Sequence, residues 1–452
     1  MPSRLHFGWS LTAILAVALV LRLGAGMWWQ QRLPDGHKFA FGDSDSYWEL
    51  GRAIAKGRPY EYGPDGLKIF RTPGYPALLA PLFWLADEPP VLWARALSAV
   101  LSTVAVGLTA VLARMLFDEF AALIAAVIAA ISPESVAVGV FVLSEAGFAP
   151  LMMLNLICWI RAYQTAYQPV EPGKKRLRWV VWSLGAGAAA GLATLMRPSW
   201  LLFVPFAGIA GCAMQGLSSK VIKGPKSKSV RQSLAITGWV VVGLAFSMLP
   251  WWIRNYVVAK RFVPTTLQVG ASLYDGISPT ASGASDMRFV GHFVAEQRGA
   301  DAQAEFPPPG LFEDRLDRRM RQAAVAWAKR NPRRLLELVG IKLLRMWSIL
   351  PNAGEFQNRW LKLTLAFTYP PVMILALVGA WRFSDRGWPI WLCCLPAIYL
   401  TCLHVIFVSS IRYRQPAMLA LIVLAAGLVS EWVLSRGGRI VGRAGIGSPY
   451  QL

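Results

Sequence analysis

Charged side chains are scarce in this sequence. Only 16% of its 452 residues are Asp, Glu, Lys or Arg, whereas 55% are hydrophobic. The mean hydropathy is +0.43. These values exclude a soluble domain of this length, which would need a larger share of charged residues. Long apolar runs stand where the charges are missing, so the sequence predicts an all-α polytopic membrane protein.

Residues that bind metals or form redox centres are also few. The four histidines are widely separated, which argues against a histidine-based metal centre. The five cysteines lie in apolar segments without metal-ligand spacing, so we interpret them as packing residues. They are Cys158, Cys212, Cys393, Cys394 and Cys402. The sequence therefore indicates no certain cofactor, and a divalent metal is compatible with it but not required.

Ten segments approach the length of about 20 residues that a helix needs to cross a bilayer. The first, near Trp9 to Trp29, is too long and too poor in small residues for a classical signal peptide, so we expect it to be retained. Two further apolar segments, 73–87 and 336–352, either cross the membrane or lie in its interface. We therefore expect about 10 to 12 transmembrane helices. The ten segments lie near 8–29, 91–115, 119–136, 138–163, 179–196, 198–216, 235–253, 361–381, 388–409 and 414–436.

Positive charge is in excess, with a net charge of +21, and it lies mostly in loops between the apolar segments. We attribute it to membrane topology and anionic lipid headgroups, and not to nucleic acid. The basic clusters within 174–178 and 220–231 are predicted to be cytoplasmic. Counting helices from these clusters places loop 30–90 and segment 254–335 on the outer face.

Three regions follow from this topology. Residues 1–253 form an N-terminal transmembrane module that includes the first outer loop, residues 254–335 form an outer-face loop subdomain, and residues 336–452 form a C-terminal transmembrane module. Segment 254–335 is too long to be a simple connector, so we expect it to be functional. No internal repeat is visible, which weakens the case for a transporter built from duplicated halves.

Three acidic residues are candidates for catalysis. Asp43 and Asp45 lie in the first outer loop, where a carboxylate could accept a proton from an acceptor nucleophile. Alternatively, Asp43 or Ser44 caps a helix over 44–56, which Gly57 and Pro59 would end. Glu145 lies in an apolar segment near its outer end, and an ionisable residue there indicates function unless it only reaches the interface.

Several arginines map to the same face. Arginine stays charged and binds phosphate with two parallel hydrogen bonds, although contact with lipid headgroups is the simpler explanation. Arg412 and Arg414 fall on the outer side against the positive-inside rule, so we expect them to have a function. The candidates for donor-phosphate binding are Arg71, Arg197, Arg254, Arg412 and Arg414. The candidates for positioning the acceptor are Tyr47, Tyr75, Asn255 and Tyr413.

These residues together favour chemistry at the outer face. Nucleotide cofactors are absent from that compartment, so an enzyme acting there needs a substrate that is already activated. A membrane-borne phosphate ester meets this need, because arginines can neutralise its phosphate while the lipid lies among the helices. The alternative is a multi-pass lipid or solute transporter or flippase, for which we would expect charges deep in several spans.

The order of short motifs also resembles a known family. The motifs are GDSDSYWELGRAIAKG followed by RTPGYP, then LSE, GLATLMRPS, PWWIRNY with FVPTTLQVG, KRNP and RYRQP. Spread over residues 20–425, they resemble GT-C glycosyltransferases of the dolichyl-phosphate-mannose protein mannosyltransferase and lipid A aminoarabinose transferase type. The resemblance implies a GT-C-like bundle of about 10 to 12 transmembrane helices with outer-face loop helices.

The resemblance further implies an inverting enzyme that moves a sugar from a polyprenyl-phosphate donor to a lipid, glycan or protein acceptor. An acidic residue of the first outer loop is catalytic in such enzymes, and the pattern aligns Asp43 with it, with Asp45 as the alternative. Glu145 falls where a second acidic residue is common, and Arg254, Arg412 and Arg414 would face the carrier phosphate. The expected location is a bacterial inner membrane, with the site on the periplasmic face.

Overall fold

The computed structural model describes residues 4–34, 36–167, 177–217, 226–306, 308–350 and 359–437. Seven helices in these ranges are long and apolar enough to cross a membrane. They are α1 (Arg4–Gln30), α4 (Val91–Leu116), α7 (Glu145–Tyr167), α8 (Leu177–Met196), α10 (Lys226–Ala259), α15 (Arg359–Arg382) and α17 (Ile411–Gly437). Shorter apolar helices complete the bundle, namely α3 (Gly74–Leu85), α5 (Glu119–Ile131), α9 (Phe203–Leu217) and α16 (Trp388–His404). The chain is therefore an integral membrane protein.

All ten predicted spans correspond to helices, with two differences. The predicted span 119–136 is divided, because α5 ends at Ile131 and Pro133 begins the short helix α6 (Pro133–Val138). The predicted span 138–163 begins only at Glu145, after a non-helical segment. The cytoplasmic assignment of Lys174, Lys175, Arg176, Lys220 and Lys223 concerns residues outside the described ranges.

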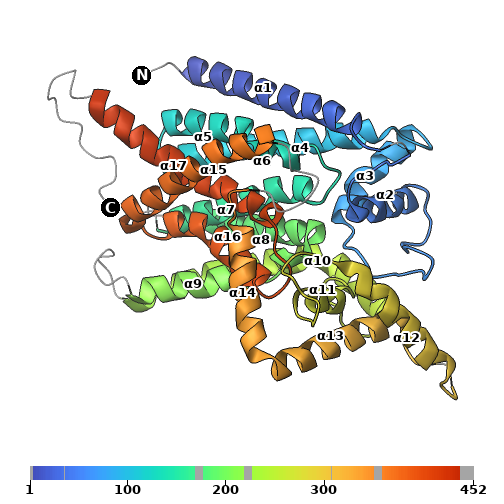
Figure 1. Cartoon of the computed structure of the whole chain (residues 1–452). Coiled ribbons are helices and arrows are strands. Elements are labelled where there is room, and N and C mark those ends of the chain that lie inside the picture. Colours follow the sequence, from blue (N-terminus) through green and yellow to red (C-terminus); the bar gives the residue numbers. More distant parts are fainter. Residues whose placement is uncertain are drawn as a thin grey trace.

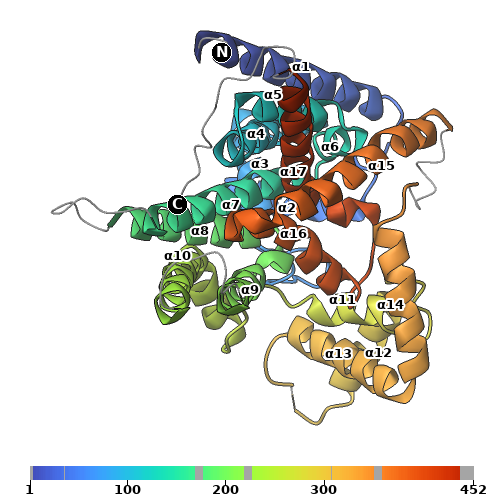
Figure 2. The same ribbon diagram turned by 90° about the vertical axis from the view of Figure 1, so that its left-hand side faces the viewer.

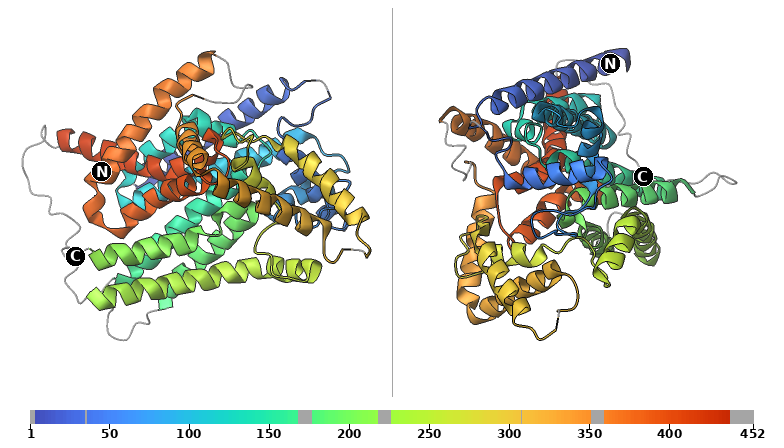
Figure 3. Two further views of the ribbon diagram at one scale, coloured as in Figure 1. Left: turned by 60° about the horizontal axis from the view of Figure 1, so that its bottom comes forward. Right: turned by 90° about the vertical axis from the view of Figure 1, so that its right-hand side faces the viewer.

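Close backbone contact holds two of the spanning helices together. Figure 3 shows α8 beside α10. At Gly243 of α10 an added Cβ atom would lie 2.3 Å from the carbonyl oxygen of Leu184, and at Gly187 of α8 it would lie 2.0 Å from that of Val240. Small residues permit this approach, which strengthens dispersion contacts between helices in a membrane.

Non-spanning helices gather at one end of the bundle, which we call the loop end. They include α2 (Gly42–Ala55), α11 (Val269–Gly276), α12 (Val290–Ala302) and α13 (Phe312–Arg330). The start of α1 and the end of α17 lie at the opposite end (Figure 1). The loop end thus brings together the first loop and the subdomain that the sequence assigns to residues 254–335.

The segment predicted to cross or to lie in the interface at 336–352 forms α14 (Pro332–Met346). Figures 1 and 2 show α14 running across the direction of the long helices and not along it. The other ambiguous segment, 73–87, forms α3, which packs against α2 and has only 12 residues. Both elements therefore differ from the seven long apolar helices.

The predicted capping of α2 is wrong. The helix begins at Gly42, its N-cap is Phe41, and no side chain makes a capping hydrogen bond. Asp43 lies in the first turn, where its negative charge suits the positive end of the helix dipole. The predicted end of the helix is confirmed, since α2 ends at Ala55 and Gly57 follows with φ +61.

Candidate active site

Asp43 is held between two arginines from distant parts of the chain. Nη2 of Arg71 donates to Oδ1 of Asp43 at 2.6 Å, and Nη2 of Arg412 lies 3.3 Å from Oδ2. Arg71 also donates to Oγ of Ser46 at 3.1 Å and to Oε1 of Gln268 at 3.0 Å. Each of the three nitrogens of the Arg71 guanidinium thus donates one hydrogen bond, which fixes the loop after α2 against the segment before α11.

Glu145 forms the second acidic centre. Its Oε1 lies 2.7 Å from Nη1 of Arg197 and 2.8 Å from Nε of Arg412. Glu145 begins α7, where the helix dipole also favours a negative charge. Arg412 therefore bridges the two carboxylates, and the helices α2, α7 and α17 meet at its guanidinium.

Positive charge exceeds negative charge in this cluster. Three guanidiniums, of Arg71, Arg197 and Arg412, face two carboxylates, of Asp43 and Glu145, which leaves one positive charge. A mostly buried group of this kind suits a bound anion. The two acids differ in access, because the Asp43 side chain is 37% exposed and that of Glu145 is 3% exposed.

The pKa of Asp43 reflects two opposing effects. Burial raises it, but the charges and hydrogen bonds of Arg71 and Arg412 outweigh burial and hold the pKa below its usual range. Asp45 has no such partners: it is exposed, takes part in none of these ion pairs, and its pKa is raised by partial burial. Two residues along a helix are separated by about 200°, which explains why only one of the two acids reaches the cluster.

Tyr47 and Tyr75 lie on the side of the cluster that contains Arg71. The hydroxyl of Tyr47 donates to Oγ of Ser144 at 3.2 Å, and its ring meets Tyr75 edge to face at 5.2 Å. The Arg71 guanidinium lies 5.3 Å from the centre of the Tyr47 ring. Tyr75 is fully buried and shares a hydrogen bond with Ser98 at 3.1 Å, so its contacts are those of a packing residue.

The ring of Tyr413 lies beside Arg197 and Arg412. The guanidiniums of Arg197 and Arg412 lie 5.0 and 5.2 Å from the centre of its ring. The ring of His404 stacks on Tyr413 at 4.2 Å, and Nδ1 of His404 lies 2.8 Å from the carbonyl oxygen of Val408. This platform keeps the two guanidiniums beside each other.

Three predicted residues make other contacts. Arg254 donates to the carbonyl oxygen of Tyr60 at 3.1 Å, and Asn255 donates to those of Val263 and Thr265. Arg414 is fully buried, pairs with Glu134 at 2.7 Å and donates to the backbone of 346 and 348. Through these contacts the three residues hold the fold. The predicted residues that come together are Asp43, Glu145, Arg71, Arg197, Arg412, Tyr47 and Tyr413.

Sequence reasoning missed four residues of the cluster. Ser144 and Gln268 lie within motifs that the sequence singles out, so their position in those motifs was an available signal. Ser46, three residues after Asp43, also lies within a quoted motif, but nothing set it apart from the other residues of that motif. His404 has no motif around it, and only the folded structure brings it to Tyr413.

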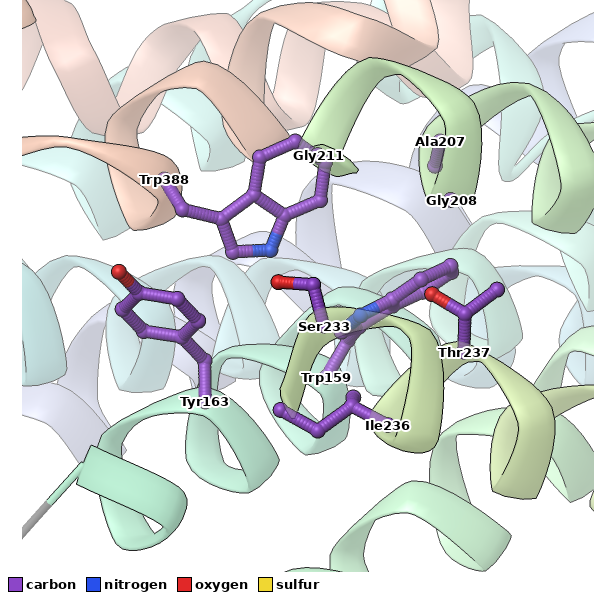
Figure 4. Close-up of a pocket in the computed structure, with 9 residues that line it drawn as sticks. All are labelled: Trp159, Tyr163, Ala207, Gly208, Gly211, Ser233, Ile236, Thr237 and Trp388. Carbon is purple, nitrogen blue, oxygen red and sulfur yellow. The ribbon is translucent and has the colours of Figure 1, made fainter. Parts of the chain in front are cut away.

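A small cleft lies elsewhere, between α7, α9, α10 and α16 (Figure 4). Its lining contains no charged residue and consists of aromatic, small and hydroxyl-bearing residues together with the aliphatic Ile236. Trp388 and Trp159 lie on opposite sides of it, with Ser233 and Thr237 from α10. The cleft does not include any residue of the ion-paired cluster. In the described part of the chain, no three His, Cys, Asp or Glu side chains gather as metal ligands would.

Comparisons with known proteins agree with this architecture. Residues 75–263 match the family model of dolichyl-phosphate-mannose-protein mannosyltransferase. The structure is similar to the archaeal oligosaccharyltransferase AglB from Archaeoglobus fulgidus in complex with an inhibitory peptide and a dolichol-phosphate, with TM-score 0.58, 16% identity, and coverage of 97% of this chain and 53% of AglB. The apo form gives TM-score 0.60 with the same identity and coverage. The chain thus spans about half the length of these proteins.

ArnT from Cupriavidus metallidurans bound to undecaprenyl phosphate is also similar, with 16% identity, coverage of 95% of this chain and 78% of ArnT, and a TM-score of 0.43. No curated protein matches the sequence significantly. The AglB superpositions confirm a GT-C-like helical fold, as the sequence predicts. The family model supports the mannosyltransferase resemblance over residues 75–263.

Proposed function

We propose that the protein is a membrane glycosyltransferase that moves a sugar from a polyprenyl-phosphate donor to a lipid, glycan or protein acceptor. The observation that carries this proposal is the bridge of Arg412 between Asp43 and Glu145, with Arg71 and Arg197 beside it. The fold shared with AglB, whose structure contains a dolichol-phosphate, supports the same donor class.

Charge balance supports a phosphate donor. A lipid-linked sugar phosphate is a diester with one negative charge, which matches the one surplus positive charge of the cluster. When the bond between sugar carbon C1 and the phosphate oxygen breaks, its electron pair leaves with the phosphate, which then carries a second negative charge. The fixed guanidiniums stabilise this added charge without reorganising.

Asp43 fits the role of the group that receives the acceptor proton. The acceptor oxygen attacks C1 from the face opposite the phosphate, which inverts the configuration at C1. The proton released from that oxygen passes to the Asp43 carboxylate, so the cluster gains one positive charge as the phosphate gains one negative charge. Asp43 is the more exposed of the two acids, while Glu145 holds Arg197 and Arg412 in place.

The lowered pKa of Asp43 bears on when the acceptor proton is transferred. A carboxylate that is ion-paired with two arginines is a weak base towards a resting hydroxyl. Proton transfer becomes favourable only as the new bond to C1 forms and acidifies the hydroxyl. In this proposal Asp43 first orients the acceptor by accepting its hydrogen bond, and no metal is required for charge neutralisation.

Location and partners follow from the same proposal. The site lies at the loop end of the bundle, which we assign to the outer, periplasmic face of a bacterial inner membrane. Membrane lipids surround the spans, and no nucleic acid is expected. The transporter alternative receives no support, because the fold similarity is to glycosyltransferases and the Asp43 cluster lies at one end of the bundle.

The test is transfer of radiolabelled sugar from a panel of polyprenyl-phosphate sugars to membrane lipids and proteins. Wild type should transfer label, and Asp43→Asn should lower the rate by about 10²- to 10⁴-fold, since it cannot accept the proton. Asp45→Asn is the matched control, two residues away in the same helix, and should stay within threefold. An equal loss of transfer rate in both variants would show that Asp43 is not the specific proton acceptor. Absence of transfer by folded wild type would contradict the proposal.

A further inference from the structure

Lys342 is a buried cation that the proposed mechanism does not use. It lies on α14, the residue is 1% exposed, and Nζ donates to the carbonyl oxygens of Val405 at 3.2 Å and Ile406 at 2.8 Å. These carbonyls belong to the two residues that directly follow α16, at the C-terminal end of that helix. A cation there complements the negative end of the helix dipole.

The segment that Lys342 holds is the linker 405–410 between α16 and α17. Oγ of Ser409 donates to the carbonyl oxygen of Lys342 at 2.6 Å, and the backbone N–H of Ser409 donates to Gly283 at 2.9 Å. At Gly276 an added Cβ atom would lie 2.8 Å from the carbonyl oxygen of Ile406, so only glycine allows this approach. The linker is thus fixed by three separate elements of the loop end.

Both ends of this linker lead into the proposed site. Its first neighbour is His404, which stacks on Tyr413 and binds back to the carbonyl oxygen of Val408. Arg412 comes two residues after the linker and bridges Asp43 and Glu145. A shift of the linker backbone would therefore displace the guanidinium and the aromatic platform together.

Asp275 partly offsets the cost of burying the Lys342 charge. Burial lowers the pKa of Lys342 to about 8, and the nearby Asp275 opposes that decrease. Asp275 is itself buried and accepts hydrogen bonds from Ser285 at 2.7 Å and from the backbone of Asp286 at 2.8 Å. Desolvating a lysine is costly, and here its two carbonyl acceptors offset that cost.

We infer that Lys342 is a positioning residue, which ties the loop-end subdomain to the linker 405–410 and thereby sets the place of Arg412 in the reaction. This inference rests on the proposed glycosyltransferase function. Lys342 would affect catalysis by holding backbone carbonyls of the linker, without contacting the substrate. Displacing a catalytic group by about 1 Å can lower a rate by about 10²-fold, so a measurable effect is expected.

The test compares three lysine variants of the full-length protein. Lys342→Met should lower kcat for sugar transfer by about 10- to 100-fold. Lys342→Arg, which can still donate to two carbonyls, should restore most of the rate. Lys329→Met removes the same charge from an exposed position of the neighbouring α13 and should stay within twofold of wild type.

A double mutant separates positioning from general damage. In an Arg412→Lys background, adding Lys342→Met should lower kcat by less than a further threefold, because the group that Lys342 positions is already altered. A full additional loss there would overturn the inference, as would unchanged kcat in Lys342→Met. If Lys342→Met does not fold, Ser409→Ala serves instead, with an expected threefold or greater loss of kcat, and no loss would overturn the inference.

A binding measurement distinguishes this inference from the proposed function. Polyprenyl monophosphate should raise the thermal unfolding midpoint of wild type, and Lys342→Met should reduce this shift by at least half, because Arg412 is displaced. Wild type that binds the lipid but transfers no sugar would contradict the glycosyltransferase proposal alone. Wild type that transfers sugar, with an unchanged shift and kcat in Lys342→Met, would contradict only the positioning role.

Discussion

Two arginines that are two residues apart on α17 have different contacts. Arg412 lies in the ion-paired cluster, whereas Arg414 is fully buried against Glu134, with its guanidinium 3.9 Å from the centre of the Tyr369 ring. Both belong to the motif RYRQP, and both were predicted to bind the donor phosphate. The structure separates them, so their substitutions should have different consequences.

Arg414→Gln should destabilise the fold. It leaves the Glu134 carboxylate buried without its cation, which typically costs about 3–5 kcal/mol. The expected result is a clear decrease of the thermal unfolding midpoint in detergent. Arg412→Gln is the matched comparison, since it should remove sugar transfer while changing the midpoint less. The reverse order of the two midpoints would show that Arg412 holds the fold instead.

The pH dependence of Asp43 has a definite sign. Its folded pKa is lowered, so its ion pairs stabilise the protein fully above the unfolded value of about 3.9 and lose this effect as pH falls through the folded pKa. Transfer by wild type should therefore persist to pH values below about 4 before Asp43 is protonated.

Removing one of the arginines should shift that acid limit. In Arg71→Gln the burial effect is less opposed, so the acid limb of the pH–rate profile should move to higher pH. Arg58→Gln is the control, because Arg58 is exposed and lies in the same loop. An acid limb that stays in place in Arg71→Gln would mean that another group sets it.

At the scale of helices, the sequence predicted the spanning helices correctly but not the start of α2. Apolar runs of the right length gave every spanning helix, because the bilayer imposes that length locally. The capping of α2 was predicted wrongly, since a local rule assigned Asp43 to the backbone while two distant arginines bind it. Asp43 and Arg412 are 369 positions apart, so no local pattern could predict their pairing.

The contact of α8 and α10 gives a prediction for these elements. Gly243→Ala should lower the unfolding midpoint, because the added Cβ atom would lie 2.3 Å from the Leu184 carbonyl oxygen and push the helices apart. Overpacking of this kind typically costs about 1–3 kcal/mol. Gly238→Ala, on the same helix with nothing within 4 Å, should be neutral or stabilising. Equal midpoints for the two variants would contradict close packing at Gly243.

At the scale of the molecule, α13 joins the loop-end subdomain to the first loop. Oε1 of Glu313 accepts from the backbone N–H groups of Lys68 and Ile69, both at 3.0 Å. The N–H of Leu267 donates to the carbonyl oxygen of Ile69 at 2.9 Å. These bonds position Arg71 from outside its own loop, which the sequence alone could not indicate.

Glu313→Ala should therefore loosen the first loop without touching Asp43. We expect limited trypsin digestion to cut after Arg58 or Lys68 several times faster than in wild type, together with slower sugar transfer. Glu305→Ala is the control, because Glu305 is exposed on the same subdomain. Unchanged digestion in Glu313→Ala would show that other contacts suffice to hold the loop.

The buried Arg414 pair also fixes the rotational phase of α17. Residues two apart on a helix point about 200° apart, so anchoring Arg414 toward Glu134 forces Arg412 toward the opposite side, where Asp43 and Glu145 lie. The ion pair of Arg414 thus sets the direction in which the Arg412 side chain leaves the helix. A single residue inserted between them would turn the helix by about 100°, and both guanidiniums could not then meet their carboxylates at once.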